Sequence, residues 1–229
     1  MADRKEMQDY VNTQSLWKGH PDKWYQAGIE LPYGIVTESL YPGKESDCRE
    51  IWELLHISEG DIVGKNVLDV GCNTGYYAMR CKEIGAKSVT AFDNSEWIDS
   101  GIKFAEWKGI EIDWHKCDFI NMDWNKRYDT VLALQVLYHL GSGRDALRLM
   151  GESCNEILIL YTKVRSESFK PDGVHYFPTM FELEDDLRGF GFLIELVDCH
   201  DRQLLDKVLT NEEPLLVKVA IRANHTWNK

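Results

Sequence analysis

Short apolar runs alternate with amphipathic stretches from about residue 66 onward. The apolar runs occupy residues 66–70, 88–93, 110–118, a stretch that begins at about 128, and 156–162. Helical spacing of apolar side chains is found at 75–85, 95–109 and 144–153. Because the runs contain few polar residues, they are typical of strands that are buried on both faces. Strands that alternate with helices predict an α/β fold with a parallel sheet covered by helices on both sides.

The C-terminal part departs from this alternation. The elements expected there are a helix over 179–191 and strands over 192–200 and 214–223. Two successive strands with no helix between them predict a terminal antiparallel hairpin. The predicted fold is therefore a Rossmann-like, doubly wound sheet of about seven strands, mostly parallel. Gly85 and Gly109 are the expected stops of the first two helices of the alternation, and Ser95 is the expected N-cap of the second.

The first 60 residues are predicted to form a separate N-terminal region. Residues 3–18 and 48–57 carry apolar side chains at helical spacing. The stretch that begins at His20 is rich in aromatic residues, Gly and Pro, which favours an ordered loop or a short hairpin over a linker. We therefore expect helices and an aromatic lid segment over 1–60, and the sheet domain over 61–229.

Composition and charge limit the classes of function. The 229 residues suit one domain with a short extra segment, and no apolar run approaches the ~20 residues that span a bilayer. The charged N-terminus lacks the apolar core of a signal peptide. Six scattered cysteines form no zinc-like cluster, which indicates a cytoplasmic protein with reduced thiols and no metal site. A net charge of −12 disfavours a large nucleic-acid partner, although a local basic patch is compatible with it.

Acidic residues stand at or near the carboxyl ends of three predicted strands. Asp69, Asp93 and Asp118 occupy these places, where ligands bind in doubly wound sheets. Gly71 and Gly75, which lie between the first two acids, allow a tight turn and the close approach of a ligand. A carboxylate at Asp93 can accept both hydroxyls of a ribose, so the ligand is predicted to contain a nucleoside.

The turn discriminates between nucleoside ligands. It reads G-x-N-x-G, with an acid two residues before the first glycine, and therefore differs from the G-x-G-x-x-G of nicotinamide-binding folds. Asn73 is tolerated in the middle because Asn adopts left-handed backbone more readily than most residues. An acid at this place suits an ammonium or amino-acid ligand and not a pyrophosphate. The turn spacing therefore contradicts a nicotinamide oxidoreductase, and the chain has no P-loop pattern.

Four segments together resemble the motifs of class I S-adenosylmethionine-dependent methyltransferases. They are "VLDVGCNTGYY" for the first motif, "AFDNS" for the ribose-binding motif, "KCDFIN" for the adenine-contacting motif and "YDTVLALQVLYHL" for the fourth strand. Their order and spacing match over about residues 63–162. The resemblance implies a Rossmann-like methyltransferase domain whose cofactor is S-adenosylmethionine.

A closer resemblance points to tRNA wobble-uridine carboxymethyltransferases and their relatives. The segments "GIVTES", "VLYHL" and "VHYFPTMFELEDDLRGFGF" carry it, together with the first motif. The chain departs from that group in lacking much of its N-terminal extension. The group's ligand, carboxy-S-adenosylmethionine, has an extra carboxylate that needs cationic partners, for which Lys18 and Lys23 are candidates. The departure and the acidic charge favour plain S-adenosylmethionine and a small acceptor.

The resemblance implies a role for each motif residue. The expected cofactor contacts are Asp69 and Gly71 beneath the methionine, Cys72, Asn73 and Gly75 in the turn, Tyr76 in the pocket, Asp93 and Asn94 at the ribose, Asp118 and Phe119 at the adenine, and Gln135 at the methionine end. Two plainer interpretations stay open: Asp118 as a helix or loop cap, and Gln135 as a solvated loop residue. Of the tyrosines that begin the first helix, Tyr76 is expected in the pocket and Tyr77 in the core.

Tyr138 and His139 are the candidate catalytic residues, because they follow the fourth strand, where an acceptor must lie. Histidine is the usual general base near neutral pH, but a structural histidine and methyl transfer by positioning alone stay open. The aromatic lid from Trp24 to Tyr41 either contacts the sulfonium by cation–π attraction or covers the core. The loop at His175–Phe177 is expected to overhang the acceptor site.

Three functions are compatible with these motifs. The first is a methyltransferase that acts on an oxygen or nitrogen of a small molecule, the second is a tRNA wobble-uridine modifying enzyme, and the third is a non-catalytic cofactor-binding partner subunit. The intact turn and its acids disfavour the third. We expect a cytoplasmic monomer or homodimer without a membrane partner.

Overall fold

A seven-stranded sheet in the order β10-β11-β9-β8-β5-β6-β7 forms the centre of the computed structural model, which describes residues 2–15, 19–39, 47–140, 142–167, 175–210 and 216–225. The strands are β5 (Asn66–Val70), β6 (Ser88–Asp93), β7 (Asp113–Lys116), β8 (Tyr128–Leu134), β9 (Cys154–Arg165), β10 (Phe192–Asp198) and β11 (Leu216–His225). The strands from β9 to β7 pair in parallel, whereas β11 is antiparallel to both of its neighbours. The predicted Rossmann-like sheet is therefore confirmed.

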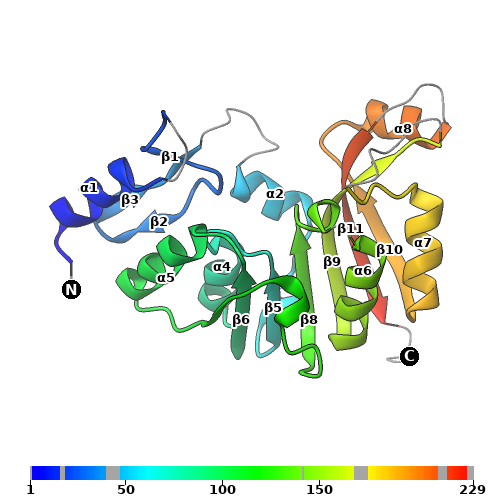
Figure 1. Cartoon of the computed structure of the whole chain (residues 1–229), viewed down its shortest axis with the longest axis horizontal. Coiled ribbons are helices and arrows are strands. Elements are labelled where there is room, and N and C mark those ends of the chain that lie inside the picture. Colours follow the sequence, from blue (N-terminus) through cyan, green and yellow to red (C-terminus); the bar gives the residue numbers. More distant parts are fainter. Residues whose placement is uncertain are drawn as a thin grey trace.

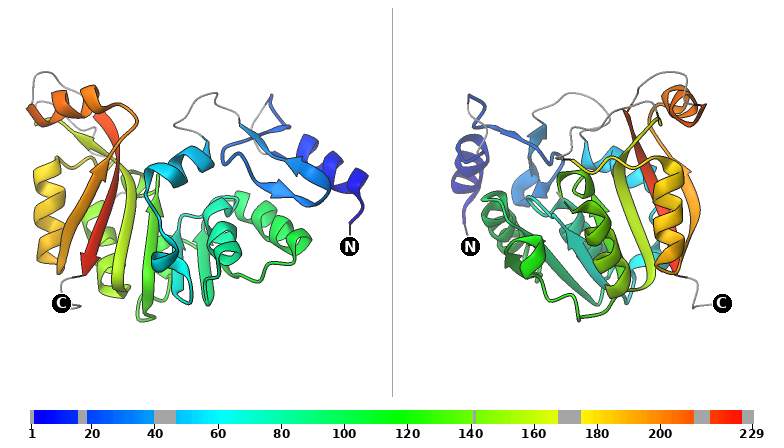
Figure 2. Two further views of the ribbon diagram at one scale, coloured as in Figure 1. Left: turned by 180° about the vertical axis from the view of Figure 1, so that it is seen from behind. Right: turned by 45° about the vertical axis from the view of Figure 1, so that its right-hand side comes forward.

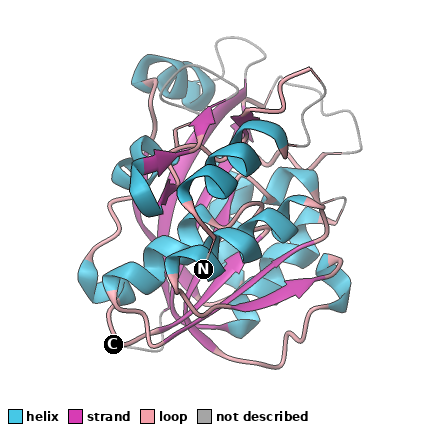
Figure 3. Cartoon of the chain, turned by 90° about the vertical axis from the view of Figure 1, so that its left-hand side faces the viewer, coloured by secondary structure: helices cyan, strands magenta, loops and turns pink. Residues whose placement is uncertain are grey.

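Helices lie on both sides of the sheet (Figure 3). They are α2 (Cys48–Leu54), α3 (Glu59–Ile62), α4 (Tyr76–Ile84), α5 (Trp97–Lys108), α6 (Gly143–Ser153) and α7 (Met180–Gly189). Successive side chains of a strand point to opposite faces. Val67 therefore belongs to the hydrophobic core under α4 and α5, and Leu68 to the core under α6 and α7. Because each face has its own core, the strands are as apolar as the sequence pattern indicated.

The N-terminal segment lies near the carboxyl ends of the strands, above α4 and α5 in Figure 1. It comprises α1 (Arg4–Thr13), β1 (Lys23–Trp24), β2 (Glu30–Leu31), β3 (Ile35–Val36) and β4 (Glu38–Ser39). Strands β2 and β3 pair antiparallel and form a short hairpin, one of the two structures expected for this stretch. Met7, Trp24 and Ile29 are buried in the same core as α4 and α5. The division of the chain at residue 60 stays a prediction, and Tyr41 lies outside the described residues.

An unpredicted helix, α8 (Arg202–Thr210), lies between β10 and β11. The prediction of two successive strands without a helix was therefore wrong, although these strands do pair antiparallel. Leu205 and Val208 are buried and share one helix face, because they are three residues apart. Figure 2 shows α8 at the same end of the sheet as the N-terminal segment.

Helices α4 and α5 end at the predicted glycines. Gly85 and Gly109 cap α4 and α5 with left-handed backbone, at φ of 115° and 66°. The N-cap of α5 is Glu96 and not the predicted Ser95; Ser95 belongs to the turn after β6, where its N–H donates to the Asp93 carboxylate. Strand β7 is shorter than predicted, since the Ile110 N–H still bonds back into α5. None of the helices in the described part of the chain is long and apolar enough to span a bilayer.

Candidate active site

Two adjoining cavities open at the carboxyl ends of β5, β6 and β8. They measure about 630 and about 320 Å³ and share Gly71, Asp93, Asn94, Val136 and His139. Strand β5 has β6 on one side and β8 on the other, so the strand order reverses here. Ligands of doubly wound sheets bind at this point. The combined space is in the range of small-molecule and cofactor sites.

The turn after β5 borders the larger cavity. Gly71, Asn73 and Gly75 all have positive φ, at 69°, 51° and 76°. A Cβ atom on Gly71 would lie 2.5 Å from Cγ2 of Val136, and one on Gly75 would lie 2.3 Å from Cη2 of Trp114. Both positions therefore require glycine for backbone shape and for space. The tight turn predicted from the two glycines is present.

Asp93 ends β6 and lines both cavities. Its Oδ2 accepts the Asn73 N–H and its Oδ1 accepts the Ser95 N–H, each at 2.8 Å. These two bonds fix the carboxylate against the turn. Each oxygen keeps a further lone pair for a ligand hydroxyl. The arrangement is compatible with the predicted contact to two ribose hydroxyls.

Asp69 is buried in β5 and lines neither cavity. Burial raises the pKa of its carboxyl to about 7; a hydrogen bond from the Ala78 backbone opposes the shift and the charge of Asp93 adds to it. Its Oδ2 has no hydrogen-bond partner among the residues that the structure describes. A buried acceptor without a donor, two residues before the turn, suits a cationic ligand group above it, and this contact stays a prediction.

Asp69 is expected to make the fold less stable as pH rises. The unfolded carboxyl ionises near pH ~4, whereas the folded one holds its proton to about pH 7. Unfolding between these pH values releases a proton, so this carboxyl lowers the free energy of unfolding as pH rises from ~4 to about 7. Asp69→Asn should remove this contribution, as measured by urea unfolding over that range. An unchanged slope would show that Asp69 ionises normally in the fold.

The smaller cavity has an acidic and an aromatic side. Asp118 and Phe119 line it, and Asn94 Nδ2 donates to Asp118 Oδ1 at 3.1 Å. The ring centroid of Phe119 lies 4.6 Å from that of Trp124. Asp118 precedes a short 3-10 helix, but its side chain makes no capping hydrogen bond there. The placement favours a ligand contact over the cap interpretation, and the contact with adenine stays a prediction.

Two residues of the N-terminal segment, Tyr25 and Gln26, also line the larger cavity. The Tyr25 hydroxyl donates to Gln135 Oε1 at 3.2 Å. Gln26 Oε1 accepts from Thr74 Oγ1 at 3.1 Å and from the Tyr76 N–H at 3.0 Å. Because the first N–H groups of a helix lack partners within it, Gln26 ties the N-terminal segment to the start of α4. No sequence pattern marks Gln26 as a site residue.

Gln135 lines the larger cavity, as predicted for the methionine end. Its backbone has φ of 62°, and its N–H donates to the Tyr161 carbonyl at 2.6 Å. Positive φ at a residue other than glycine is costly and is concentrated at functional sites. Its half-buried side chain, held by Tyr25, argues against a solvated loop residue.

The other aromatic residues of the lid segment divide between core and surface. Trp24 is fully buried, and its ring contacts those of Trp97 and Phe104. Tyr33 is 56% exposed. Among the described aromatic residues of this segment, Tyr25 alone lines the larger cavity. The segment therefore covers the core and also contributes one side chain to the cavity wall.

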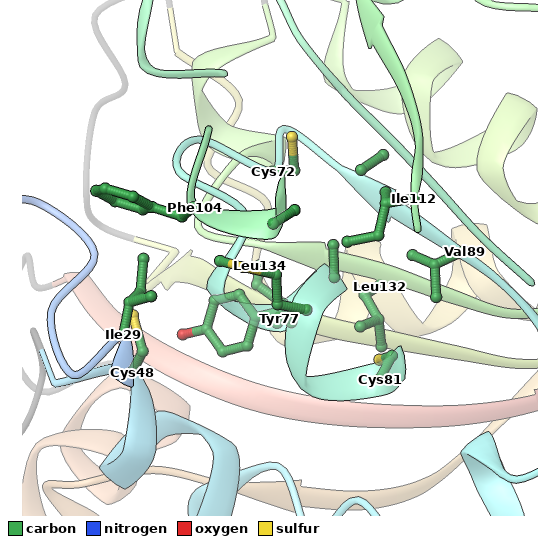
Figure 4. Packing of buried hydrophobic residues seen from close by; sticks show 14 of the residues in the cluster. Ile29, Cys48, Cys72, Tyr77, Cys81, Val89, Phe104, Ile112, Leu132 and Leu134 are labelled. Atoms are coloured by element: carbon green, nitrogen blue, oxygen red, sulfur yellow. The ribbon is translucent and has the colours of Figure 1, made fainter. Parts of the chain in front are cut away.

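Tyr77, and not Tyr76, lines the larger cavity, so the prediction that Tyr76 faces it was wrong, whereas Tyr77 is buried in the core as predicted. Figure 4 shows the Tyr77 hydroxyl turned toward Cys48 and Ile29. Tyr76 lines a separate cavity of about 290 Å³ together with Arg49. Consecutive helix residues point ~100° apart, in agreement with the two tyrosines lining different cavities.

Cys72 and Tyr138, two predicted site residues, are buried and line neither cavity. Cys72 takes part in the turn through its N–H, which donates to the Phe92 carbonyl at 2.9 Å. Burial raises the pKa of the Tyr138 hydroxyl, and neighbouring Tyr25 adds to the shift. In contrast to its predicted catalytic placement, Tyr138 therefore lies behind the cavity wall.

His139 is exposed and lines both cavities, as expected for a residue at the acceptor end. Its ring centroid lies 4.4 Å from that of Tyr138 and 6.0 Å from that of His175. The loop at 175–177 therefore reaches the rim of the cavities, in agreement with its predicted position. Among the described residues, no three His, Cys, Asp or Glu side chains are grouped as metal ligands.

The match to a known family gives the class of the protein. Residues 47–196 match the family described as "Methyltransferase domain", and the chain belongs to this family. The class predicted from the four motifs, the S-adenosylmethionine-dependent methyltransferases, is thereby confirmed.

Curated relatives share the class but differ in the acceptor that their names give. The tRNA U34 carboxymethyltransferase of Ectopseudomonas mendocina (strain ymp) is 29% identical over 195 residues, which cover 78% of this chain and 58% of that protein. Ribosomal protein arginine N-methyltransferase rmt3 of Schizosaccharomyces pombe is 51% identical over 96 residues, which cover 41% of this chain and 17% of that protein. The chain thus spans only part of each relative's length.

A solved structure supports the fold over almost the whole chain. Magnesium protoporphyrin IX methyltransferase from Synechocystis PCC 6803, with bound S-adenosylmethionine, has a TM-score of 0.60 and 18% sequence identity. The similarity covers 98% of each chain. At this identity the likeness concerns the fold, which includes the N-terminal segment and the C-terminal strands.

Proposed function

We propose that the protein transfers a methyl group from S-adenosylmethionine to an oxygen or nitrogen atom of a small-molecule acceptor. The observation that carries the proposal is the position of Asp93. Its carboxylate, held by two backbone N–H groups, stands between two adjoining cavities at the reversal of the strand order. A ribose bound there would direct the base into one cavity and the methionine into the other.

The cavity linings support one orientation of the cofactor. Asp118 and Phe119 would receive the adenine in the smaller cavity, and Asp93 would accept the ribose hydroxyls. The methionine part would follow the turn toward Gln135 in the larger cavity. The buried carboxyl of Asp69, two residues before the turn, would lower the cost of placing an ammonium group above it.

The charge of the cavities favours plain S-adenosylmethionine over carboxy-S-adenosylmethionine. None of the described residues that line the two cavities is a lysine or an arginine. An extra carboxylate buried without a cation would be strongly destabilised. Lys23, one predicted partner, forms an ion pair with Glu38 instead. Lys18, the other, lies outside the described residues.

The arginines beside the loop at 175–177 favour a small acceptor over tRNA. Arg144 pairs with Asp186 at 2.7 Å, and Arg165 pairs with Glu182 at 3.0 Å. Their charge is therefore already neutralised at the rim. Phosphates of a tRNA arm need a track of available cations, and the net charge of −12 makes such a track harder to form elsewhere.

A tRNA wobble-uridine carboxymethyltransferase is the second candidate, because several curated relatives carry that name. Salt-sensitive binding of bulk tRNA at low micromolar concentration would favour it over a small-molecule acceptor.

A non-catalytic partner subunit is a third candidate, and the open cavity and intact turn argue against it. We further propose a cytoplasmic location, since all six cysteines are free thiols, and a monomeric or homodimeric state.

His139 is the residue placed to handle a proton. The bound cofactor would supply the methyl group, and an acceptor hydroxyl or amine would lose a proton as its new bond forms. His139 lines the rim of both cavities and is exposed, so its ring can accept that proton and pass it to solvent. In-line positioning of the acceptor supplies the rest of the rate enhancement.

His139→Ala is expected to lower kcat roughly 100- to 10,000-fold, because a positioned general base contributes about this factor. The dissociation constant for S-adenosylmethionine should be nearly unchanged. A screen of metabolites for methyl transfer would supply the acceptor, and kcat would be compared at saturating cofactor. His20→Ala, an exposed histidine outside both cavities, is the control and should retain full activity. Full turnover by His139→Ala would leave positioning as the whole mechanism.

A further inference from the structure

We propose that the acceptor of this methyltransferase carries an anionic group, and that Lys163 binds this group beside the rim of the cofactor cavities. The inference rests on the proposed function, and it adds the chemical class of the acceptor. Lys163 lies near the carboxyl end of β9 and is half-buried.

Two aromatic rings lie close to the ammonium group of Lys163. Its Nζ lies 4.6 Å from the ring centroid of Tyr138 and 5.8 Å from that of Phe177. Ring faces attract a cation and hold it in place, but they leave its charge without an anion. The side chain of Lys163 is therefore positioned and still able to pair with a ligand.

A continuous set of rings joins Lys163 to the rim of the cavities. Tyr138 contacts His139, which lines both cavities, at 4.4 Å between centroids. His175 contacts His139 at 6.0 Å and stacks on Phe177 at 5.5 Å, with 15° between the ring planes. Lys163 therefore lies one ring away from the residue placed to receive the acceptor's proton.

Lys163 differs from the neighbouring arginines in its ion pairing. Among the described residues, no carboxylate forms an ion pair with Lys163, whereas Arg165, two residues further along β9, pairs with Glu182. Arg144 of α6 pairs with Asp186. The described lining of the cofactor cavities holds no lysine or arginine, and the Tyr138 ring separates Lys163 from His139, so we assign this cation to the acceptor and not to the cofactor.

The shape of the surroundings favours a small planar acid. Phe177 lies beside the ammonium group and His175 stacks on Phe177; both side chains are half-buried, so their rings can pack against another aromatic ring. A carboxylate or a phosphate would supply the anion. Paired with Lys163, it would hold the acceptor so that its hydroxyl or amine points toward His139 and the cavity.

The test is a titration of the full chain loaded with S-adenosylhomocysteine. Benzoate is compared with benzamide, its neutral counterpart, and with phenyl phosphate, and binding is followed by NMR shifts. We expect both anions to bind roughly 10- to 100-fold more tightly than benzamide, in line with a charged hydrogen bond. Lys163→Met should abolish this preference, and Lys163→Arg should retain most of it. Tighter binding of phenyl phosphate than of benzoate would support a phosphate as the anionic group.

Lys103→Met is the matched control. Lys103 also lies over an aromatic ring, 4.5 Å from the centroid of Tyr10, but on α5 and outside both cavities. The Lys103→Met variant should keep the full preference for benzoate and phenyl phosphate over benzamide. Equal binding of benzoate and benzamide by a protein that binds S-adenosylhomocysteine would overturn this inference alone. Weaker binding of carboxy-S-adenosylmethionine by Lys163→Met, with S-adenosylmethionine binding unchanged, would also overturn it, because the anion would then belong to the cofactor. Failure to bind S-adenosylhomocysteine would overturn the proposed function and this inference with it.

Discussion

Asp93→Ala is expected to weaken binding of S-adenosylmethionine roughly 30- to 150-fold without unfolding the chain. The substitution removes a charged acceptor of two ribose hydroxyls, a loss of about 2–3 kcal/mol. The same carboxylate holds the N–H groups of Asn73 and Ser95, so the turn also loses an anchor. Calorimetric titration of the folded variant would measure the change.

Two further variants separate charge from local structure. Asp93→Asn keeps the shape of the side chain and one oxygen acceptor, so it should lose less affinity for S-adenosylmethionine than Asp93→Ala. Asp99→Ala removes an acid of α5 that pairs with Lys116 and lines neither cavity, and it should bind the cofactor normally. An unchanged dissociation constant in folded Asp93→Ala protein would refute the ribose assignment.

Gly75→Ala is expected to lower the free energy of unfolding by about 2–5 kcal/mol. Left-handed backbone at φ of 76° costs about 1–2 kcal/mol for a residue with a Cβ atom. That atom would lie 2.3 Å from Cη2 of Trp114, and relief of this overlap costs about 1–3 kcal/mol more. Urea unfolding of the variant and of the parent protein would measure the difference.

Gly109→Ala is the matched control for this prediction. Gly109 also has left-handed backbone, at φ of 66°, but a Cβ atom there would have no neighbour within 4 Å. The free energy of unfolding of Gly109→Ala should fall only by the cost of left-handed backbone, about 1–2 kcal/mol. Equal losses in the two variants would show that Trp114 moves aside at no cost, and that Gly75 is required for backbone shape alone.

The sheet and the turn were predictable because their signals are local in the sequence. Apolar runs such as 66–70 and 88–93 form the strands β5 and β6, since strands buried on both faces contain few polar residues. Gly71 and Gly75 predicted the turn, and both have the positive φ that favours glycine. Asp93 was identified because the carboxyl end of a strand is where such sheets bind ligands.

Two of the remaining features depend on contacts between distant segments. Gln26 joins the site through hydrogen bonds to residues 48 and 50 positions further along the chain, and nothing in its own sequence neighbourhood indicates them. The choice between Tyr76 and Tyr77 depends on the rotation of α4 about its axis, which packing decides. Helix α8 was overlooked although Leu205 and Val208 have helical spacing, because two flanking strands suggested a simple hairpin.

The most direct test of the central claim, that the cavities beside Asp93 hold S-adenosylmethionine, is a calorimetric titration of the full chain. S-adenosylmethionine and S-adenosylhomocysteine would each be titrated, and NAD would be titrated separately. We predict micromolar-range binding of at least one of the first two and no binding of NAD. Binding of NAD without binding of S-adenosylmethionine or S-adenosylhomocysteine would contradict the cofactor assignment and the function built on it.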